Sequence, residues 1–521
     1  MVWLMRRRKF LLGTASATAL VTTGCHQGPP MLSPVLSTPA GQMQGQIIDG
    51  VHKFLGIPYA EPPFGTLRWL TPVRRKPWSG VLQATQYGQI CPQTGGMARD
   101  ALVEGEDCLN LNIWTPDPAA RGLPVMVWAH GGGQVSGSGA DAIYDGGHFA
   151  QEGVVLVTCN RRLGAEGFLY LEELFGENVG PGNLGMQDLI CVLEWLTDNV
   201  QSFGGDPNNI TLFGESGGAA AAQATIATPG ASGLINRAIL QSGGHAVQRP
   251  ATATRIAHHV IDQLGIKMRD IEALRAVHWQ KFVELYAALN TRHVWADPQI
   301  YLPVLNQHLP VHPVDAPFAG FGLDIDYLVG TCREEANFFD MLMDLEGSQF
   351  DRRARKVVAV SGAEWSDVLN RYREIHPEWD ADDCFNAALG DMWFRVPSLR
   401  IAEGHQQQSQ KGTYTYLFEW SSPLIGASHA LDLMVFGNGL PLPGIAAFKN
   451  FGKTATFMRK AWVAFAKTGS PALPNQSWPS YRERQATLSI DDSPSIITAS
   501  YRQQFQMLEN AITRNWGQSG L

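Results

Sequence analysis

The sequence has little that would point to a nucleic acid, a metal or a membrane-spanning segment. Its 40 lysines and arginines are outnumbered by 48 aspartates and glutamates, and no run of more than three basic residues occurs after the first ten positions. Phosphate contacts need a concentrated basic face, so we predict no nucleic-acid partner. After residue 24, no apolar run is long enough to cross a bilayer. The seven cysteines lack the spacings of a zinc site, and we expect neither a metal nor an organic cofactor.

The bulk composition is that of a folded, water-soluble protein. Of the 521 residues, 45% are hydrophobic and 17% are charged, which allows a large buried core. Residues 25–40 are rich in Pro, Ser and Thr and are interpreted as a linker, so the folded part should begin near Gly41. No repeat or later linker divides the rest. We therefore predict a single domain over residues 41–521.

The N-terminal residues have the features of a targeting signal rather than of a folded segment. Residues 1–24 contain three arginines and a lysine at positions 6–9, followed by a short apolar stretch, and resemble a twin-arginine export signal. The residues before Cys25 resemble a lipoprotein cleavage site, although Thr22 stands where Leu is usual. We expect an exported protein of the periplasm or cell envelope, anchored to the membrane through lipidated Cys25. Plain cleavage at a small-residue site is the alternative.

Short apolar runs alternate with helical patterns along the chain. The runs are continuous, as in strands buried on both faces, and they cover residues 124–129, 154–159, 210–213, 238–240 and 327–329. Between the second and third runs, residues 186–200 repeat apolar positions at helical spacing. The pattern predicts an α/β fold with a mostly parallel central sheet flanked by helices. Residues 251–292 and 341–410 are interpreted as helical insertions.

A candidate nucleophile follows the run at 210–213. Gly214 and Gly218 flank Ser216 in a Gly-x-Ser-x-Gly pattern, and residues 219–222 are four alanines. An esterase elbow needs a strand, a turn that admits only small neighbours, and a helix directly behind the serine. This order is present, and it predicts that Ser216 is the nucleophile. An ordinary glycine turn with a surface serine is the alternative.

A glycine cluster after the run at 124–129 supplies a candidate oxyanion site. Three glycines follow His130, and their backbone N–H groups are open to a carbonyl oxygen because no side chain obstructs them. We assign Gly132 and Gly133 as donors, with Gly217 as the third. His130 itself is interpreted as a structural hydrogen-bonding residue rather than a base.

A serine nucleophile also needs a histidine base and a carboxylate behind it. The α/β-hydrolase order is serine, acid, histidine, which leaves three candidates late in the chain, His376, His405 and His429. The first two lie in charged or polar stretches and are interpreted as surface residues. His429 follows a strand-like run at 414–420 by a short loop, and it is the preferred base.

The acid is expected directly after the strand at 327–329. Glu334 and Glu335 both lie there, and residue chemistry alone does not choose between them. Asp432 is a further option, but it is so close to His429 in sequence that a supporting role suits it better.

These motifs together resemble the carboxylesterase type-B family, which includes the cholinesterases. The resemblance covers roughly residues 40–515. It extends to the segments 106–112, 162–169, 182–185, 426–429 and 462–469. It implies an α/β-hydrolase fold and a serine esterase that acts on small-molecule esters.

The resemblance also assigns individual residues. It places the acid at Glu335 and the base at His429. It implies a disulfide between Cys91 and Cys108, and an ion pair between Arg68 and Glu106.

Several positions depart from the family pattern. Gln134 stands where an aromatic residue is usual, Arg161 replaces a tyrosine, and Glu166 replaces an aromatic residue. After Ser216, Gly-Gly-Ala stands where Ala-Gly-Gly is usual. None of these departures changes a residue of the predicted triad, but all are expected to affect the pocket or its packing.

The function predicted from the sequence is ester hydrolysis through an acyl-enzyme, with a preference for neutral short- to medium-chain esters. The charge preference follows from residues 92–107, where cholinesterases carry an aromatic face for the choline cation and this chain has no Trp, Tyr or Phe. A binding or adhesion role without catalysis, and a lipase acting at lipid interfaces, are the alternatives.

Overall fold

The computed structural model describes residues 31–93, 102–244, 246–293, 300–343, 355, 364–439, 451–498 and 508. The predicted export signal and Cys25 lie outside the described residues, so the export and lipidation of this chain stay predictions. None of the helices in the described ranges combines the length and apolar character needed to span a bilayer.

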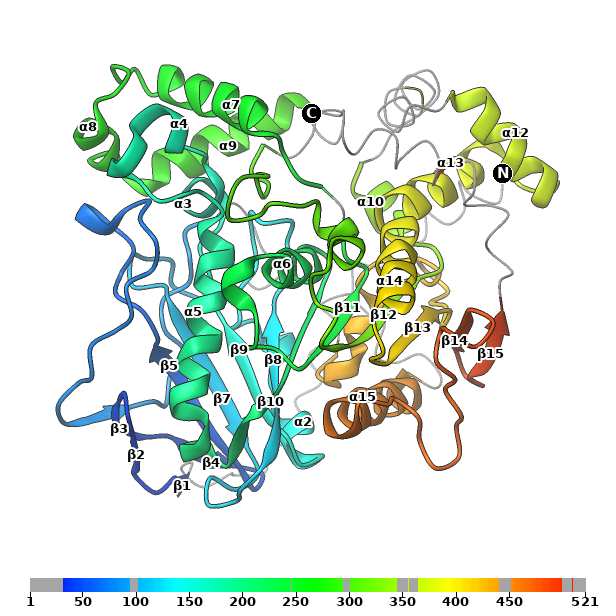
Figure 1. The fold of residues 1–521 in the computed structure, drawn as a ribbon, viewed down its shortest axis with the longest axis horizontal. Coiled ribbons are helices and arrows are strands. Elements are labelled where there is room, and N and C mark those ends of the chain that lie inside the picture. Colours follow the sequence, from blue (N-terminus) through cyan, green and yellow to red (C-terminus); the bar gives the residue numbers. More distant parts are fainter. Residues whose placement is uncertain are drawn as a thin grey trace, which may run out of the picture.

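One large sheet runs through the molecule (Figure 1). Its order is β1-β4-β5-β7-β9-β8-β10-β11-β12-β13-β14-β15, and neighbours from β9 to β14 pair in parallel. The parallel strands are β9 (Val155–Cys159), β8 (Leu123–Ala129), β10 (Gly205–Glu215), β11 (Arg237–Gln241), β12 (Asp326–Cys332), β13 (Thr413–Phe418) and β14 (Ala486–Ile490). They include every apolar run predicted to be a strand. The antiparallel strands at the two edges are β1 (Met31–Leu32), β4 (Gln46–Ile48), β5 (Val51–Pro58), β7 (Asn110–Thr115) and β15 (Ser495–Thr498).

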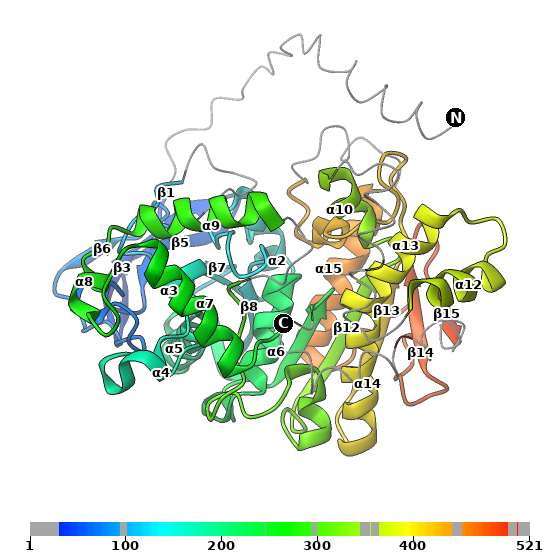
Figure 2. The ribbon, with the colours of Figure 1, turned by 90° about the horizontal axis from the view of Figure 1, so that it is seen from above.

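Helices cover both faces of the sheet, and alternate residues of each strand face different cores. In β8, Val125 and Val127 lie in one core with helices α5 and α6, whereas Met126 and Trp128 lie in a second core with α2 and α15. The view from above shows α5 and α6 on the opposite side of the strands from α2 and α15 (Figure 2). These helices are α2 (Gly147–Gln151), α5 (Leu184–Asn199), α6 (Gly217–Ile226) and α15 (Phe451–Thr468). The predicted α/β-hydrolase fold is confirmed.

The two predicted insertions are helical where they are described. The first contains α7 (Pro250–Gln263), α8 (Ile271–Arg275) and α9 (Trp279–His293). The second follows α10 (Ala336–Met343) and contains α12 (Trp365–Ile375), α13 (Ala381–Gly390), a π-helical turn (Asp391–Arg395) and α14 (Val396–Gln408). Figure 1 shows α7 to α9 at the upper left and α12 and α13 at the upper right.

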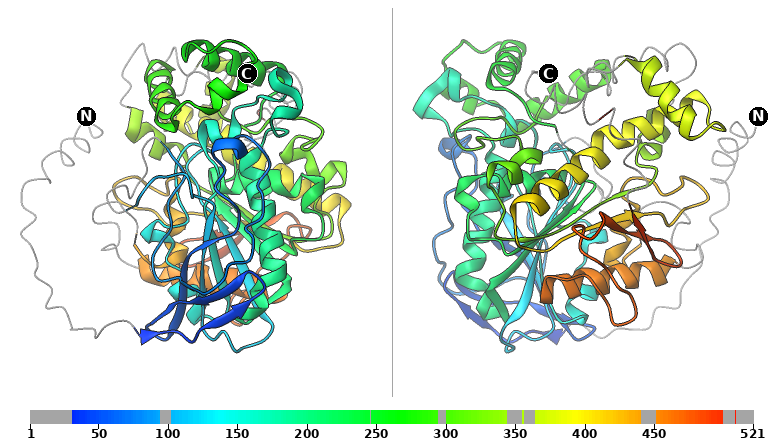
Figure 3. Two further views of the ribbon diagram at one scale, coloured as in Figure 1. Left: turned by 90° about the vertical axis from the view of Figure 1, so that its left-hand side faces the viewer. Right: turned by 45° about the vertical axis from the view of Figure 1, so that its right-hand side comes forward.

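The predicted linker at 25–40 is wrong from residue 31 onward. Met31 pairs with Ile47 in the large sheet, and β2 (Leu36–Thr38) belongs to a small second sheet with β3 (Gly41–Gln44) and β6 (Val81–Gln83). These blue strands come to the front in the left-hand view of Figure 3. Ser33 anchors the segment, because its N–H donates to the carbonyl of Gly45 at 3.0 Å and its Oγ accepts from the N–H of Gly45 at 2.9 Å. The proline and serine content of this segment therefore led to a predicted start of the folded part that is too late in the chain.

Candidate active site

Ser216 occupies a strained turn between β10 and α6. Its φ of 55° and ψ of −125° are rare for a residue with a side chain, and such strain collects at functional sites. The flanking glycines are required by space: a Cβ on Gly214 would lie 2.6 Å from the carbonyl carbon of Gly218, and one on Gly218 would lie 2.0 Å from the Ala129 oxygen. The strand, turn and helix expected of a nucleophile elbow are all present.

The glycine loop lies against this turn. β8 and β10 pair in parallel with Ala129 opposite Gly214, so both loops leave the sheet at the same edge. A Cβ on Gly217 would lie 2.6 Å from the backbone nitrogen of Gly133, which shows how closely the two segments approach. Gly132 and Gly133 have φ values of 102° and 61°. The structure thus brings the three predicted oxyanion donors together beside Ser216, at the N-terminus of α6.

Glu335 and His429 meet across the ends of neighbouring strands. Glu335 follows β12, His429 follows β13, and Nδ1 of His429 lies 2.6 Å from Oε2 of Glu335. The other oxygen of Glu335 accepts hydrogen bonds from Ser242 Oγ at 2.6 Å and from the Cys332 N–H at 2.7 Å. Both side chains are buried. Glu335 is therefore a fixed acceptor that holds the imidazole in one orientation.

Glu334 points elsewhere and is half-buried. It accepts from the N–H of Ala427 at 2.7 Å and lies 3.5 Å from the guanidinium of Arg333. The structure thus distinguishes the two neighbouring glutamates by their contacts, and only Glu335 touches the histidine.

A second carboxylate also contacts the histidine. Nε2 of His429 lies 3.1 Å from Oε1 of Glu215, the residue before the nucleophile. Burial opposes protonation of His429, but the carboxylates of Glu215 and Glu335 outweigh it and raise its pKa to about 9. Burial raises the pKa of Glu215 to about 8, although His429 opposes that shift. Both groups therefore hold a proton to higher pH than they would in water, His429 because of the neighbouring carboxylates and Glu215 because of burial.

Aromatic side chains pack around the histidine ring. The ring centroids of Phe394, Phe339 and Phe338 lie 4.6, 5.1 and 6.0 Å from that of His429. Sequence reasoning missed these residues and Ser242. The position of Ser242 directly after β11 was an available signal, because catalytic loops leave that edge of the sheet. The phenylalanines come from helices and carried no comparable signal.

The other histidines differ partly from expectation. His376 is partly exposed and stacks on Trp379. The prediction that His405 is a surface residue is wrong, because it is fully buried and its Nδ1 lies 2.8 Å from Oγ1 of Thr413. Helix α14 turns it toward the sheet. Burial lowers the pKa of His130 to about 3, with the charge of Arg161 acting in the same direction, so His130 stays neutral as a structural residue would.

The predicted ion pair of Arg68 with Glu106 is also wrong. Glu106 is exposed, whereas Arg68 is buried against Glu166 and donates through Nε to Oε2 at 2.9 Å. Glu166 is one of the departures from the family pattern. Its carboxylate pairs with the guanidinium and satisfies a charge that would be costly to bury alone.

The predicted Cys91–Cys108 disulfide is not formed in this structure. Both residues are buried free thiols. A hydrogen bond joins the two thiols and contributes with burial to a raised pKa of Cys108. Cys91 Sγ also accepts from the N–H of Leu163 at 3.2 Å. The two side chains are thus neighbours, as the family resemblance implied, but they are held by hydrogen bonds and packing.

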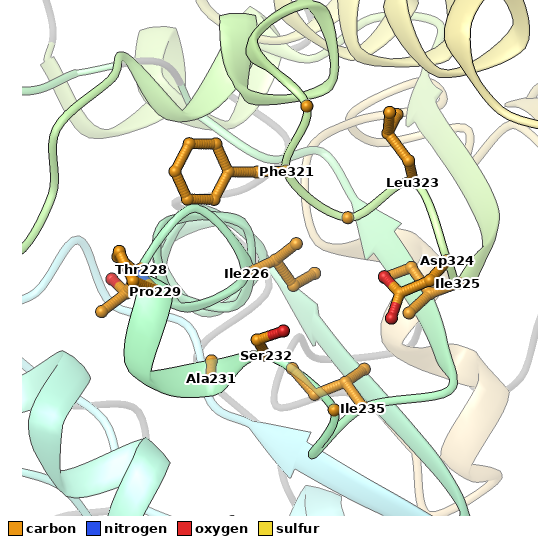
Figure 4. Close-up of a pocket in the computed structure, with 13 residues that line it drawn as sticks. Ile226, Thr228, Pro229, Ala231, Ser232, Ile235, Phe321, Leu323, Asp324 and Ile325 are labelled. Carbon is orange, nitrogen blue, oxygen red and sulfur yellow. The ribbon is translucent and has the colours of Figure 1, made fainter.

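A surface hollow of about 440 Å³ lies away from these residues. Ile226, Pro229 and Phe321 are among the residues that line it (Figure 4). The residues that line it come before the amino ends of β11 and β12 in the chain. Ser216, Glu335 and His429, in contrast, follow the carboxyl ends of β10, β12 and β13. It is therefore separate from the candidate site. Within the described ranges, no group of three or more His, Cys, Asp or Glu side chains is arranged to hold a metal.

The sheet, the serine elbow and the glycine loop define an α/β hydrolase of the esterase type. The model of the carboxylesterase family matches residues 32–508, and the chain belongs to this family. It is an enzyme that hydrolyses carboxylic esters.

Named proteins that are similar to this chain include esterases and a hydrolase. The chain is 34% identical to the para-nitrobenzyl esterase of Bacillus subtilis (strain 168), over 90% of this chain and 96% of that one. It is 33% identical to the phenmedipham hydrolase of Pseudarthrobacter oxydans, over 88% and 95%. Among solved structures, a thermophilic PNB esterase superposes with a TM-score of 0.82 at 30% identity, over 91% of this chain and 99% of that one.

Proposed function

We propose that the chain hydrolyses neutral carboxylic esters of short to medium acyl length through an acyl-enzyme on Ser216. The observation that carries the proposal is the 2.6 Å contact between Nδ1 of His429 and Oε2 of Glu335. It sits at the same sheet edge as a serine held in a strained turn. This contact leaves Nε2 as the proton-accepting nitrogen of a neutral imidazole.

In the acylation step, Oγ of Ser216 bonds to the ester carbonyl carbon while His429 takes the hydroxyl proton. The π electrons of the carbonyl move to its oxygen, which accepts hydrogen bonds from the N–H groups of Gly132, Gly133 and Gly217. When the intermediate collapses, the bond to the alcohol oxygen breaks and His429 gives its proton to the leaving alcohol. The acyl group stays on Ser216.

In the deacylation step, water attacks the acyl carbon and gives a proton to His429. The bond to Oγ then breaks, the proton returns to Ser216, and the carboxylic acid leaves. Glu335 keeps the imidazole oriented and supports its positive charge in both steps. No group other than these side chains, the backbone donors and water is needed.

The proposed charge preference is supported by the absence of aromatic residues from positions 92–107. The relative named para-nitrobenzyl esterase carries the name of an uncharged alcohol group. We also propose that the chain is exported and held in the cell envelope through Cys25, on the strength of its first 25 residues.

The decisive experiment replaces the nucleophile. We expect Ser216→Ala to lower turnover of 4-nitrophenyl butyrate by about a millionfold with an unchanged circular dichroism spectrum. Ser232→Ala, an exposed serine beside the surface hollow, serves as the matched control and should retain wild-type turnover. If Ser216→Ala keeps most of the activity, the mechanism is wrong.

A series of 4-nitrophenyl esters from acetate to palmitate tests the acyl preference. We expect catalytic efficiency to be highest for short and medium chains. A maximum at palmitate that appears only above the solubility limit would favour an interfacial lipase. Absence of turnover on every ester would favour a binding role.

A further inference from the structure

A buried cation lies directly behind the glycine loop. Arg161 follows β9 and has no solvent exposure. Its Nη1 donates to Oε1 of Gln134 at 2.8 Å, and its Nη2 donates to the carbonyl oxygen of His130 at 3.2 Å. These two acceptors stand on either side of the three glycines. The guanidinium of Arg161 therefore donates hydrogen bonds to residues at both ends of the loop that carries the proposed oxyanion donors.

Gln134 connects this loop to the nucleophile turn. Its side chain is 2% exposed, and its Nε2 donates to the carbonyl oxygen of Gly217 at 2.7 Å. Its backbone oxygen accepts from the N–H of Gly164 at 2.8 Å. The chain of contacts from Arg161 through Gln134 to Gly217 thus ties together the two segments that supply donors to the oxyanion.

Arg161 has no carboxylate to neutralise it among the described residues. The acid that acts on its charge is Asp188, but that carboxylate already receives hydrogen bonds from Arg162 at 2.7 to 3.2 Å. Nε of Arg161 is a buried atom that finds no hydrogen-bond partner in the part of the chain that the structure describes. Burial lowers the pKa of Arg161 to about 10, so it still carries its charge at neutral pH.

An uncompensated buried charge is costly to the fold, so its position calls for an explanation in function. Negative charge develops on the substrate oxygen in the tetrahedral intermediate, and a fixed cation in a low-dielectric interior acts on it over several ångströms. Gln134 and Arg161 both depart from the family pattern, and they contact each other. The hydrogen bond between them makes the two side chains one unit in this structure.

We propose that Arg161 is a positioning residue for ester hydrolysis. Through Gln134 it holds Gly132 and Gly133 against Gly217, and its unpaired charge favours the oxyanion over the neutral carbonyl. This inference rests on the proposed function, since it concerns the same acyl-enzyme chemistry.

The test compares Arg161→Gln, Arg161→Lys and the wild type. In Arg161→Gln, kcat for 4-nitrophenyl butyrate should fall by about tenfold or more, with KM within about twofold. In Arg161→Lys, which keeps the charge, part of kcat should return. Arg121→Gln removes an exposed arginine and should behave as the wild type. Unchanged kcat in Arg161→Gln would overturn the proposal.

Two inhibitors separate positioning from general support of the fold. A trifluoromethyl ketone with a butyl chain adds to the serine and carries an oxyanion, whereas the matched methyl ketone binds as a neutral carbonyl. The Ki of the first should rise by the same factor as kcat falls, and the Ki of the second should stay constant. Equal weakening of both inhibitors would mean a structural role and would overturn the proposal.

If Arg161→Gln does not fold, Gln134→Glu decides, because it places a carboxylate beside Arg161 at constant side-chain size. We expect Gln134→Glu to lose kcat by the same factor as Arg161→Gln. If Gln134→Glu keeps the wild-type kcat, or if neither variant folds, the result counts against the inference. Labelling by diethyl 4-nitrophenyl phosphate tests the proposed function separately. If Ser216 of the wild-type protein carries no phosphate after the reaction, the proposed function is refuted. If Ser216 is fully labelled but Arg161→Gln keeps the kcat of the wild type, only this inference is refuted.

Discussion

Nε2 of His429 lies 3.1 Å from Oε1 of Glu215, while Nδ1 of the same ring lies 2.6 Å from Oε2 of Glu335. The imidazole is therefore held between two buried carboxylates. The nitrogen that must accept the proton of Ser216 faces the side chain of the residue just before it. This arrangement ties the protonation of the base to Glu215.

The pH dependence of the enzyme follows from this contact. Only the neutral imidazole accepts a proton, so kcat/KM should fall as pH drops below the raised pKa of His429. Glu215→Gln removes one of the carboxylates that raise it, so the acidic limb should move to lower pH by about one unit or more. A pH profile of kcat/KM measures the shift, and Glu194→Gln, on an exposed face of α5, is the control. A limb that stays in place or moves to higher pH would contradict the assignment.

The two neighbouring glutamates should differ sharply when neutralised. Glu335→Gln should lower kcat by about 10⁴-fold, because the amide no longer favours the correct tautomer or the charged ring. Glu334→Gln loses a partly exposed ion pair and should change kcat by less than about fivefold. Steady-state kinetics of both variants on one ester make the comparison. Similar losses would show that the acid is assigned wrongly.

Substrate charge provides an independent prediction. A cation is attracted to an aromatic face by about 0.5–2 kcal/mol, and positions 92–107 contain no aromatic residue. We expect a higher kcat/KM for a neutral butyrate ester than for butyrylcholine, with leaving groups of similar ability. Glu215 does not replace the missing face, because its carboxylate contacts His429. A clear preference for butyrylcholine would overturn this expectation.

Membrane attachment is tested at Cys25. We expect the exported wild-type protein to sediment with membranes and Cys25→Ala to move into the soluble fraction, because acyl chains on this residue would supply the anchor. Immunoblots of the two fractions give the readout, and the mass of the mature N-terminus locates the cleavage. Wild-type protein found soluble after export would exclude the lipid anchor.

Much of the site was open to prediction because its parts are local in sequence. The elbow at Ser216 depends on glycines two positions away on either side, and the oxyanion loop on three consecutive glycines after a strand. Steric limits within a few residues allow such patterns few backbone conformations, so the local structure can be predicted from the motif. The chain order of serine, acid and histidine then left three histidines as candidate bases, and the short loop after the run at 414–420 favoured His429.

Contacts between distant segments were not predictable in the same way. Arg68 meets Glu166 rather than Glu106, and His405 lies in the interior although its neighbours are polar. Residues 31–38 form strands only because partners across the sheet supply their hydrogen bonds. Composition reports average behaviour and does not identify such partners.

By itself, the sequence determined the class of the protein, and it predicted the nucleophile and the edge of the sheet where catalysis is placed, since these depend on short-range spacing and on the handedness of strand–helix–strand connections. Only the tertiary structure decided which groups surround His429, that Glu215 competes for its second nitrogen, and that Arg161 is buried behind Gln134. Those relationships join residues 27 to 214 positions apart. They arise from packing, where burial and the loss of water set the charge of each group.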